Sequence, residues 1–346
     1  MADEIENKKL TMKEIASIAM VSPKTVSRVI NHEKYVKKET EEKIKEVIDK
    51  YRYTPNFFAS GLRTGRSNTF GLIIGGIENL YYAYLSNEII SYSEAHGYNV
   101  IILCNNNYDD KQCVKNVDML LARNIDALIV CSVQLNDESI KLLNNNNIPF
   151  IQFSCPLNLE NINFITADDY YGGILAAEHV IKLGHKKIFY LRMAEVFSAN
   201  ERLRAFKNTM KKNNISCTKN NISKPLYHPK EAYDETLRMI KSKKGYTAII
   251  AANDTLAISA IEAISDAGLK IPDDISIIGY DNLDITKVLK VPLTTVNSPQ
   301  KLFGNIAVKR LIEMLDNSKN SDLPIRTIVK PELIVRDSCK KLAIPS

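Results

Sequence analysis

Residues 10–31 read LTMKEIASIAMVSPKTVSRVIN, and this stretch decides the fold of the N-terminal part of the chain. Thr11 can cap a first short helix, because its side-chain oxygen can accept a hydrogen bond from a free backbone N–H. Apolar side chains then recur at helical spacing: Ile15, Ile18 and Ala19. Ser22 can cap a second helix, and Pro23 suits its first position, where no N–H is needed. The stretch predicts two short helices joined by a tight turn.

The second predicted helix has two faces of different chemistry. Its apolar stripe consists of Val26, Val29 and Ile30. Its other face carries hydrogen-bond donors and positive charge: Lys24, Thr25, Ser27 and Arg28. Such a helix can lie in the major groove of DNA and contact phosphates with its hydroxyl groups. An ordinary helical hairpin on a protein surface is the alternative, and the spacing favours DNA binding.

Length and composition describe a protein of several domains. A chain of 346 residues is too long for one hydrophobic core, so we expect two or three domains. A content of 45% hydrophobic and 25% charged residues is typical of soluble globular proteins. No apolar run approaches the ~20 residues of a membrane span. The first nine residues, MADEIENKK, lack the apolar core of a signal peptide, so we expect a cytoplasmic protein.

The cysteines give no sign of a metal site. They form no C-x-x-C pair and no spacing typical of zinc ligands, so we expect reduced thiols, no metal and no cofactor. The six are Cys104, Cys113, Cys131, Cys155, Cys217 and Cys339.

Positive charge is concentrated near the N-terminus. Residues 8–66 contain 14 Lys and Arg against 7 Asp and Glu, a net charge of +7, whereas the whole chain carries +6. The other 287 residues are therefore close to neutral. A basic module joined to a neutral body suits a nucleic-acid anchor attached to a sensing domain.

A third helix and a short amphipathic segment follow the first two helices. The pattern predicts a helix at about 38–51 that can close over them. Pro55 ends this region, and residues 56–63 have a helical pattern that Gly61 weakens by ~1 kcal/mol relative to Ala. Eight residues are too few for a stable isolated helix in water, so this segment would fold only against a partner. Residues 64–68 are typical of a linker.

These motifs resemble those of the lactose-repressor (LacI/GalR) family of transcription regulators. They are Val21-Ser22-x-x-Thr25-Val26-Ser27-Arg28-Val29-x-Asn31, Tyr53-x-Pro55-Asn56-x-x-Ala59 and Leu62-Arg63-Thr64-Gly65-Arg66. The likeness extends to near the C-terminus. It implies an all-α helix-turn-helix domain, followed by an α/β body of two subdomains with parallel sheets, like type I periplasmic binding proteins.

The resemblance implies roles for individual residues on DNA. Pro23, Lys24 and Arg28 would approach base edges, where Lys and Arg pair well with guanine. Residues 56–62 match the hinge helix, and Leu62 matches the leucine that wedges into the minor groove and kinks the duplex. The full set of expected DNA contacts is Thr11, Ser22, Pro23, Lys24, Thr25, Ser27, Arg28, Asn31, Tyr35, Asn56, Ala59 and Leu62. Met20 departs from the family, which usually has Gly in this turn, and a positive φ there would strain it.

After Asn68 the pattern changes to alternating strands and helices. Short apolar strands are expected at about 70–74, 100–104, 127–131, 149–153, 187–191, 248–251 and 276–279. Their alternation with helices indicates parallel sheets covered on both faces, in two successive sets. Ligands of such sheets bind beyond the carboxyl ends of the strands, so a ligand between two sheets would meet both sets of ends.

The resemblance implies domain boundaries. It places the helix-turn-helix domain at 1–55, the hinge helix and linker at 56–67, and an effector-binding and dimerisation domain at 68–346. Within that domain, the N-terminal subdomain would hold about 68–165 and 295–323, and the C-terminal subdomain about 166–294 and 324–346. The chain would cross between them near Thr166, near Leu293 and near 321–325.

Polar and aromatic residues at the strand ends match the family's effector site. The expected effector-binding residues are Tyr81, Tyr82, Asn105, Ser198, Arg202, Tyr227, Asn253 and Asp281. Arg202 would hold a hydroxyl or anionic group by two parallel hydrogen bonds. The family's usual Asp after the first strand is replaced by Gly76, which removes an acceptor. The alternative for each residue singly is a helix cap or a packing role, and for Tyr82 the two readings are evenly balanced.

The sequence opposes an enzyme. The five histidines are scattered, and G-x-S-x-G, G-x-x-x-x-G-K-[ST] and a G-x-G-x-x-G after a strand are all missing. We therefore expect a homodimeric regulator of the repressor type that binds a pseudo-palindromic operator under control of a small molecule, most simply a sugar or sugar derivative. The alternatives are a sugar-binding transport or sensor protein without DNA function, and a regulator that responds to a nucleobase or a protein corepressor. No leucine heptad follows the body, so a tetramerising tail is not expected.

Overall fold

The structure is a computed structural model that describes residues 10–30, 35–53, 66–105, 109–131, 135–154, 162–193, 196–316, 324 and 326–342. The chain divides into two compact units, with the boundary between Ser67 and Asn68. Each unit is described by itself below. None of the helices in the described ranges is long and apolar enough to cross a membrane. The cysteines within those ranges are free thiols, and Cys155 lies outside them.

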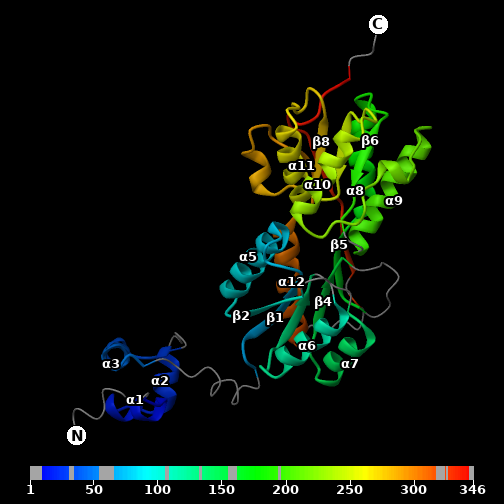
Figure 1. The fold of residues 1–346 in the computed structure, drawn as a ribbon. Helices are drawn as coiled ribbons and strands as arrows, with labels where there is room; N and C mark the ends of the chain where they lie inside the picture. The colour runs from blue at the N-terminus through cyan, green and yellow to red at the C-terminus, as the bar shows by residue number, and fades with distance from the viewer. Residues whose placement is uncertain are drawn as a thin grey trace. The chain divides into compact units, whose positions relative to one another are not determined.

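The described residues of the first unit form three helices (Figure 1), which pack around a small core. They are α1 (Met12–Ile18), α2 (Pro23–Ile30) and α3 (Lys38–Lys50). Thr11 caps α1 as expected: its side chain accepts from the Glu14 N–H, and Glu14 in turn accepts from the Thr11 N–H. Ile15, Val26 and Ile44 are fully buried, one from each helix. The core therefore fixes the angle at which α2 is presented.

Met20 occupies the turn between α1 and α2 in a left-handed conformation. Its φ is 56°, and its side chain is 84% exposed. A residue with a Cβ pays about 1–2 kcal/mol for this conformation, and nothing buries the Met20 side chain in return. The strain expected from the sequence is therefore present.

Replacing Met20 by Gly is expected to stabilise the first unit by about 0.5–1 kcal/mol, since relief of the left-handed strain exceeds the extra freedom of glycine in the unfolded chain. Hydrogen–deuterium exchange of the α1 and α2 amides in the intact chain measures this as slower exchange. Met20→Ala is the control, because alanine keeps the Cβ. Equal exchange in the two variants would contradict the assignment of strain to this turn.

The N-terminal subdomain of the second unit is built on a parallel sheet. Its strand order is β10-β5-β4-β3-β1-β2, and every neighbouring pair is parallel. The strands are β1 (Thr69–Ile74), β2 (Asn99–Cys104), β3 (Ala127–Val130), β4 (Phe150–Phe153), β5 (Phe164–Ala167) and β10 (Arg326–Val329). The helices are α5 (Leu80–Ala95), α6 (Asp110–Leu121), α7 (Asp137–Asn145) and α12 (Gln300–Leu315). One core lies under α5 and α12 and another under α6 and α7, so the sheet is covered on both faces (Figure 1).

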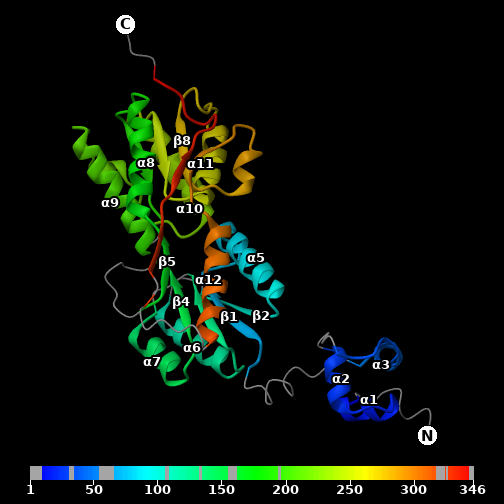
Figure 2. The same cartoon turned by 180° about the vertical axis from the view of Figure 1, so that it is seen from behind.

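The C-terminal subdomain repeats this plan with one difference. Its sheet has the order β11-β9-β8-β7-β6, and β11 runs antiparallel to β9, which the expectation of purely parallel sheets did not include. The strands are β6 (Ile188–Leu191), β7 (Ala248–Ala251), β8 (Ser276–Asp281), β9 (Thr294–Asn297) and β11 (Glu332–Ile334). The helices are α8 (Asp169–Lys182), α9 (Phe197–Lys212), α10 (Pro229–Lys241) and α11 (Asp254–Asp266), with short 3₁₀ turns at Lys219–Asn221 and Asp284–Lys287. Figure 2 shows α8 and α9 on one face of the sheet and α10 and α11 on the other.

The crossings between subdomains lie later in the chain than predicted. Strand β9 pairs with β8, so residues 294–297 belong to the C-terminal subdomain and the crossing follows them instead of preceding them near Leu293. Strand β10 pairs with β5 in the N-terminal subdomain, so the last crossing falls between Val329 and Glu332 and not at 321–325. The boundaries at 295–323 and 324–346 are corrected accordingly. Periodicity identifies a short strand, but only its hydrogen-bonded neighbours decide which sheet it joins.

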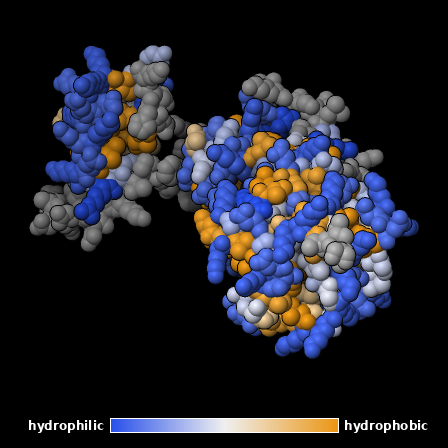
Figure 3. All heavy atoms as spheres, turned by 90° about the horizontal axis from the view of Figure 1, so that it is seen from above, coloured by the Kyte–Doolittle hydropathy of each residue, from blue (hydrophilic) through white to orange (hydrophobic). Residues whose placement is uncertain are grey.

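On the face drawn in Figure 3, hydrophilic side chains predominate and apolar side chains reach the surface in separate patches. The most exposed large apolar residues of the body are Val288, Ile77 and Val335, at 75%, 62% and 61%. Isolated residues of this kind are ordinary on a folded protein.

Candidate functional site

Helix α2 presents a polar N-terminal end. The Ser22 side chain accepts from the Thr25 N–H at 3.1 Å, which caps the helix as the sequence predicted. Ser22, Pro23 and Lys24 are exposed, and Thr25 and Arg28 are half-buried. Val26 and Val29 anchor the opposite face in the core. The exposed end therefore combines a positive charge with hydroxyl groups, as contact with DNA requires.

Ser27 does not lie on that exposed face. It is only 7% exposed, because its position faces the packed side of the short helix. Thr11 and Tyr35 are exposed, and Tyr35 reaches 89%. The remaining predicted DNA contacts lie outside the described residues: Asn31, Asn56, Ala59 and Leu62.

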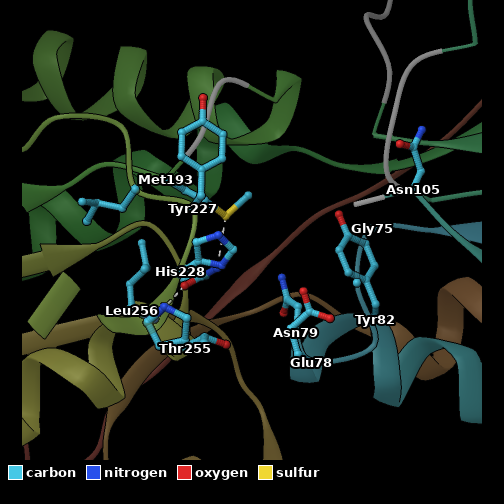
Figure 4. A pocket seen from close by; sticks show the side chains of 14 residues that line it. Gly75, Glu78, Asn79, Tyr82, Asn105, Met193, Tyr227, His228, Thr255 and Leu256 are labelled. Atoms are coloured by element: carbon cyan, nitrogen blue, oxygen red, sulfur yellow. Dashed lines mark hydrogen bonds between the residues drawn. The ribbon is translucent and has the colours of Figure 1, made fainter. Parts of the chain in front are cut away.

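A cavity of about 370 Å³ lies between the two subdomains of the body (Figure 4). Its volume falls within the ~300–1,000 Å³ range of small-molecule sites. From the N-terminal subdomain it is lined by Gly75, Gly76, Glu78, Asn79, Tyr82 and Asn105. From the C-terminal subdomain it is lined by Met193, Leu226, Tyr227, His228, Pro229, Asn253, Thr255 and Leu256. These residues follow the carboxyl ends of strands in both sheets, where the topology predicted a ligand site.

Four of the predicted effector residues line this cavity. They are Tyr82, Asn105, Tyr227 and Asn253. The Tyr82 ring lies so close to Gly75 that a Cβ there would come within 2.5 Å of it, which explains the glycine. The Tyr227 side chain is 54% exposed and therefore open to a ligand.

The two asparagines also hold the walls of the cavity in place. The Asn105 amide donates to the Asp109 carbonyl at 3.0 Å and accepts from the Asp109 N–H at 3.1 Å, which closes the loop after β2. The Asn253 carbonyl oxygen accepts from the Leu256 N–H at 2.9 Å and caps α11. Asn253 is therefore a helix cap, which the sequence analysis gave as the alternative to ligand binding.

The other four predicted residues are not among those that line the cavity. They are Tyr81, Ser198, Arg202 and Asp281. Ser198 is buried in the first turn of α9. Tyr81 is close enough to Asp281 and Asp169 for their charges, after burial, to raise its pKa. Tyr81 is half-buried and also lies near Arg202, so Tyr81, Arg202 and Asp281 belong to a polar cluster separate from the cavity lining.

Arg202 is the centre of that polar cluster, and its charge is already neutralised. Its Nε donates to Asp169 Oδ1 at 2.8 Å, and its Nη1 donates to the Ala252 carbonyl at 2.7 Å. The guanidinium lies 3.6 Å from the centre of the Tyr280 ring. Arg202 is 8% exposed and Asp169 is 3% exposed. In this structure Arg202 therefore joins α9 to α8 and to the end of β7.

Two further carboxyl groups, Asp281 and Asp254, are buried and lie near each other, and Asp281 also lies near Arg202. Burial raises the pKa of Asp281, although Arg202 opposes the shift, and burial raises the pKa of Asp254 as well. Asp254 accepts from the Thr295 hydroxyl at 2.7 Å and from the Leu283 N–H at 2.9 Å. Asp281 has a φ of 114°, a strained conformation of the kind that clusters at functional sites.

Several cavity residues were not predicted from the sequence. They are Glu78, Asn79, Met193, His228 and Thr255, together with apolar or glycine neighbours. Asn79 and His228 each begin a helix, α5 and α10, so the strand-to-helix junctions were the available signal. Glu78 gave a weaker signal, because an acidic residue in a loop is usually solvated.

Comparisons with known proteins agree with both parts of the chain. Residues 11–56 match the family described as "Bacterial regulatory proteins, lacI family", and residues 177–339 match a "Periplasmic binding protein-like domain". The chain is 31% identical over 335 residues to the HTH-type transcriptional repressor PurR of Histophilus somni (strain 129Pt), covering 96% of this chain and 99% of the relative. It is 30% identical over 335 residues to the repressor of the same name from Haemophilus influenzae (strain PittEE), with the same coverage.

Solved structures show the same architecture. The Lac repressor dimer bound to operator and the anti-inducer ONPF matches 96% of this chain and 100% of its own, with 25% identity and a TM-score of 0.83. These relatives are repressors and not enzymes, which confirms the resemblance and the exclusion of enzymes. With at least 30% identity over nearly the whole of both chains, this protein belongs to the LacI family of DNA-binding transcriptional repressors.

Proposed function

We propose that this repressor binds a pseudo-palindromic operator as a homodimer, and that a small molecule in the inter-subdomain cavity controls its operator affinity. The proposal rests on the position of the cavity. It lies between the two subdomains and is lined by residues of both, so one ligand could contact both subdomains as they close. A ligand that binds more tightly when the two subdomains are closed shifts the protein toward the closed state. If the open and closed states differ in operator affinity, the ligand changes that affinity. Such coupling is on the order of 1–3 kcal/mol and acts in both directions.

The cavity chemistry supports a sugar or sugar derivative as the effector. Asn79, Asn105 and Asn253 provide amides, and Tyr227 provides an aromatic face. Amides pair with hydroxyl groups, and aromatic rings pack against the apolar faces of sugars. A nucleobase is the second candidate, since its flat ring would stack on the same tyrosine. The abbreviation in the relatives' name, PurR, makes a purine the first nucleobase to test.

The experiment begins with selection of duplexes from a random-sequence DNA library by the full-length protein. A pseudo-palindromic consensus is expected. The Lys24→Ala variant should then bind the selected duplex about 5- to 150-fold more weakly, since one good base contact is worth about 1–3 kcal/mol, while binding to a scrambled duplex falls much less. Fluorescence anisotropy measures both affinities. Lys43→Ala, which removes an exposed lysine of α3, is the charge-matched control.

Effector control is measured with the same duplex. Adding sugars, sugar derivatives or purine bases one at a time should change the operator affinity about 5- to 150-fold for the effector class. An asymmetric consensus would contradict the dimer. Equal losses for Lys24→Ala and Lys43→Ala on the selected duplex would contradict the assignment of the reading helix.

A further inference from the structure

We infer that Glu78 supplies the acidic hydrogen-bond acceptor of the inter-subdomain cavity, and that the cavity selects an uncharged or cationic ligand over an anionic one. The inference rests on the proposed function in one respect, namely that this cavity is the effector site.

The position of Glu78 depends on Gly76. A Cβ built on Gly76 would overlap both carboxylate oxygens of Glu78, so the Glu78 side chain fills the space that any other residue at position 76 would use. Both residues line the cavity. The carboxylate lies beside Asn79 at the start of α5 (Figure 4).

The charge of the cavity wall opposes anions. Among its described lining residues there is no Lys or Arg, and Glu78 is the one carboxylate. Arg202, the cation that the sequence assigned to an anionic group, is ion-paired with Asp169 and is not part of the wall. Glu78 is exposed, so an anionic ligand would meet a like charge that solvent screens in part, and it would find no Lys or Arg in this lining to replace the hydration it loses.

Helix N-termini, the usual alternative for holding an anion, are already capped at this cavity. At α5, Asn79 accepts from the Tyr81 N–H at 3.1 Å. At α11, Asn253 accepts from the Leu256 N–H at 2.9 Å. At α10, Glu231 accepts from the Tyr227 and His228 N–H groups at 2.7 and 3.1 Å. Since their own side chains take these N–H groups, the three helix starts that converge here offer fewer free donors to a phosphate or carboxylate.

A carboxylate beside aromatic rings recognises donors. Glu78 can accept from two hydroxyl groups or hold an ammonium group, and Tyr227, which is 54% exposed, offers its ring to either kind of ligand. The Tyr82 ring is only 6% exposed and packs in the core of the N-terminal subdomain. Both kinds of ligand are small molecules with O–H or N–H donors and no negative charge. A polyol and an amine both meet this requirement, so the experiment uses probes of each kind.

The experiment compares matched probes on the full-length protein by isothermal titration calorimetry. The probes are D-glucose, D-glucosamine and D-glucose 6-phosphate; D-ribose and D-ribose 5-phosphate; and adenosine and adenosine 5′-monophosphate. At least one neutral or amine probe is expected to bind, and at least tenfold more tightly than its phosphorylated partner. Glu78→Gln should weaken that binding roughly ten- to hundredfold, the usual effect of losing a hydrogen bond to a charged group. A glucosamine preference that disappears in this variant identifies an amine ligand.

Gly76→Ala tests the geometry separately from the charge. The added Cβ displaces the flexible Glu78 side chain and leaves the carboxylate in the protein, so the variant should fold and reproduce the loss seen with Glu78→Gln. Glu94→Gln, which removes an exposed carboxylate near the end of α5, should leave binding unchanged. Tighter binding of a phosphorylated probe, unchanged affinity in Glu78→Gln, or no binding by any neutral or amine probe would each overturn the inference.

Operator measurements separate this inference from the proposed function. A probe that binds in a Glu78-dependent way but leaves operator affinity unchanged supports the inference and contradicts effector control. A probe that changes operator affinity equally in the wild type and in Glu78→Gln supports effector control and contradicts the role of Glu78.

Discussion

Replacing Arg202 by Met is expected to lower the free energy of unfolding of the body by about 3–5 kcal/mol, the usual cost of breaking a buried ion pair. The variant leaves the buried Asp169 carboxylate without its counter-charge, 2.8 Å from where Nε was. It also removes the hydrogen bond to the Ala252 carbonyl and the contact with the Tyr280 ring. Urea denaturation of the full-length protein, followed by circular dichroism, measures the loss.

The double variant Asp169→Asn/Arg202→Met is the control. Removing both charges eliminates the uncompensated carboxylate, so the double variant should be more stable than Arg202→Met alone. If Arg202→Met costs less than about 1 kcal/mol, the ion pair is not the structural link that its burial indicates. Because the sequence assigned Arg202 to the effector site, losing Arg202 is also expected to abolish the ligand response while DNA binding remains. Operator binding with and without effector, at a temperature where the variant is folded, checks this prediction.

Replacing Gly173 by Ala is expected to destabilise the body by at least about 1–3 kcal/mol through overpacking. A Cβ on Gly173 in α8 would lie 2.7 Å from the Ala205 Cβ and 2.7 Å from the Arg202 carbonyl oxygen in α9. Backbone atoms cannot give way as a flexible side chain does, so the two helices would have to separate. Because α8 carries Asp169 and α9 carries Arg202, that separation would also stretch their ion pair.

The sign of the change in the free energy of unfolding distinguishes overpacking at Gly173 from the ordinary effect of Gly→Ala. Within a helix, Gly→Ala ordinarily stabilises by about 0.5–1 kcal/mol, so a stabilised variant would show that α8 and α9 are not in close contact. The double variant Gly173→Ala/Ala205→Gly removes one of the two clashes and should recover part of the loss. Urea denaturation compares the three proteins.

The sequence predicted most of the regular elements because their signals are local. The strand expected at 248–251 coincides with β7, and the other expected strands agree with the structure within a few residues. Caps and apolar runs determine such elements without reference to the rest of the chain. Strands β5, β9, β10 and β11 and helix α12 were not predicted. Length does not separate these strands from β7, which has only four residues. Instead β9, β10 and β11 interrupt their apolar residues with Thr, Asn, Arg or Glu, which weakens the local signal.

The residues of the candidate site also fall into those that local sequence signals indicated and those that only the tertiary structure shows. The rule that ligands lie beyond strand ends, together with the family resemblance, singled out Tyr82, Asn105 and Asn253, which do line the cavity. It did not identify Glu78, because the carboxylate reaches the cavity only by folding over Gly76. That contact depends on side-chain direction, which spacing does not show.

By itself, the sequence determined the helix-turn-helix pattern, the basic charge of residues 8–66 and the membership of the LacI family, because these depend on residue types at short range. Only the tertiary structure decided which sheet each short strand joins and what Arg202 contacts. Asp169 lies 33 residues before Arg202, and Ala252 lies 50 residues after it. The packing of α8 against α9 and the end of β7 brings Asp169, Arg202 and Ala252 together. The Arg202 guanidinium, which the sequence assigned to the ligand, is therefore neutralised by Asp169 and has a structural role.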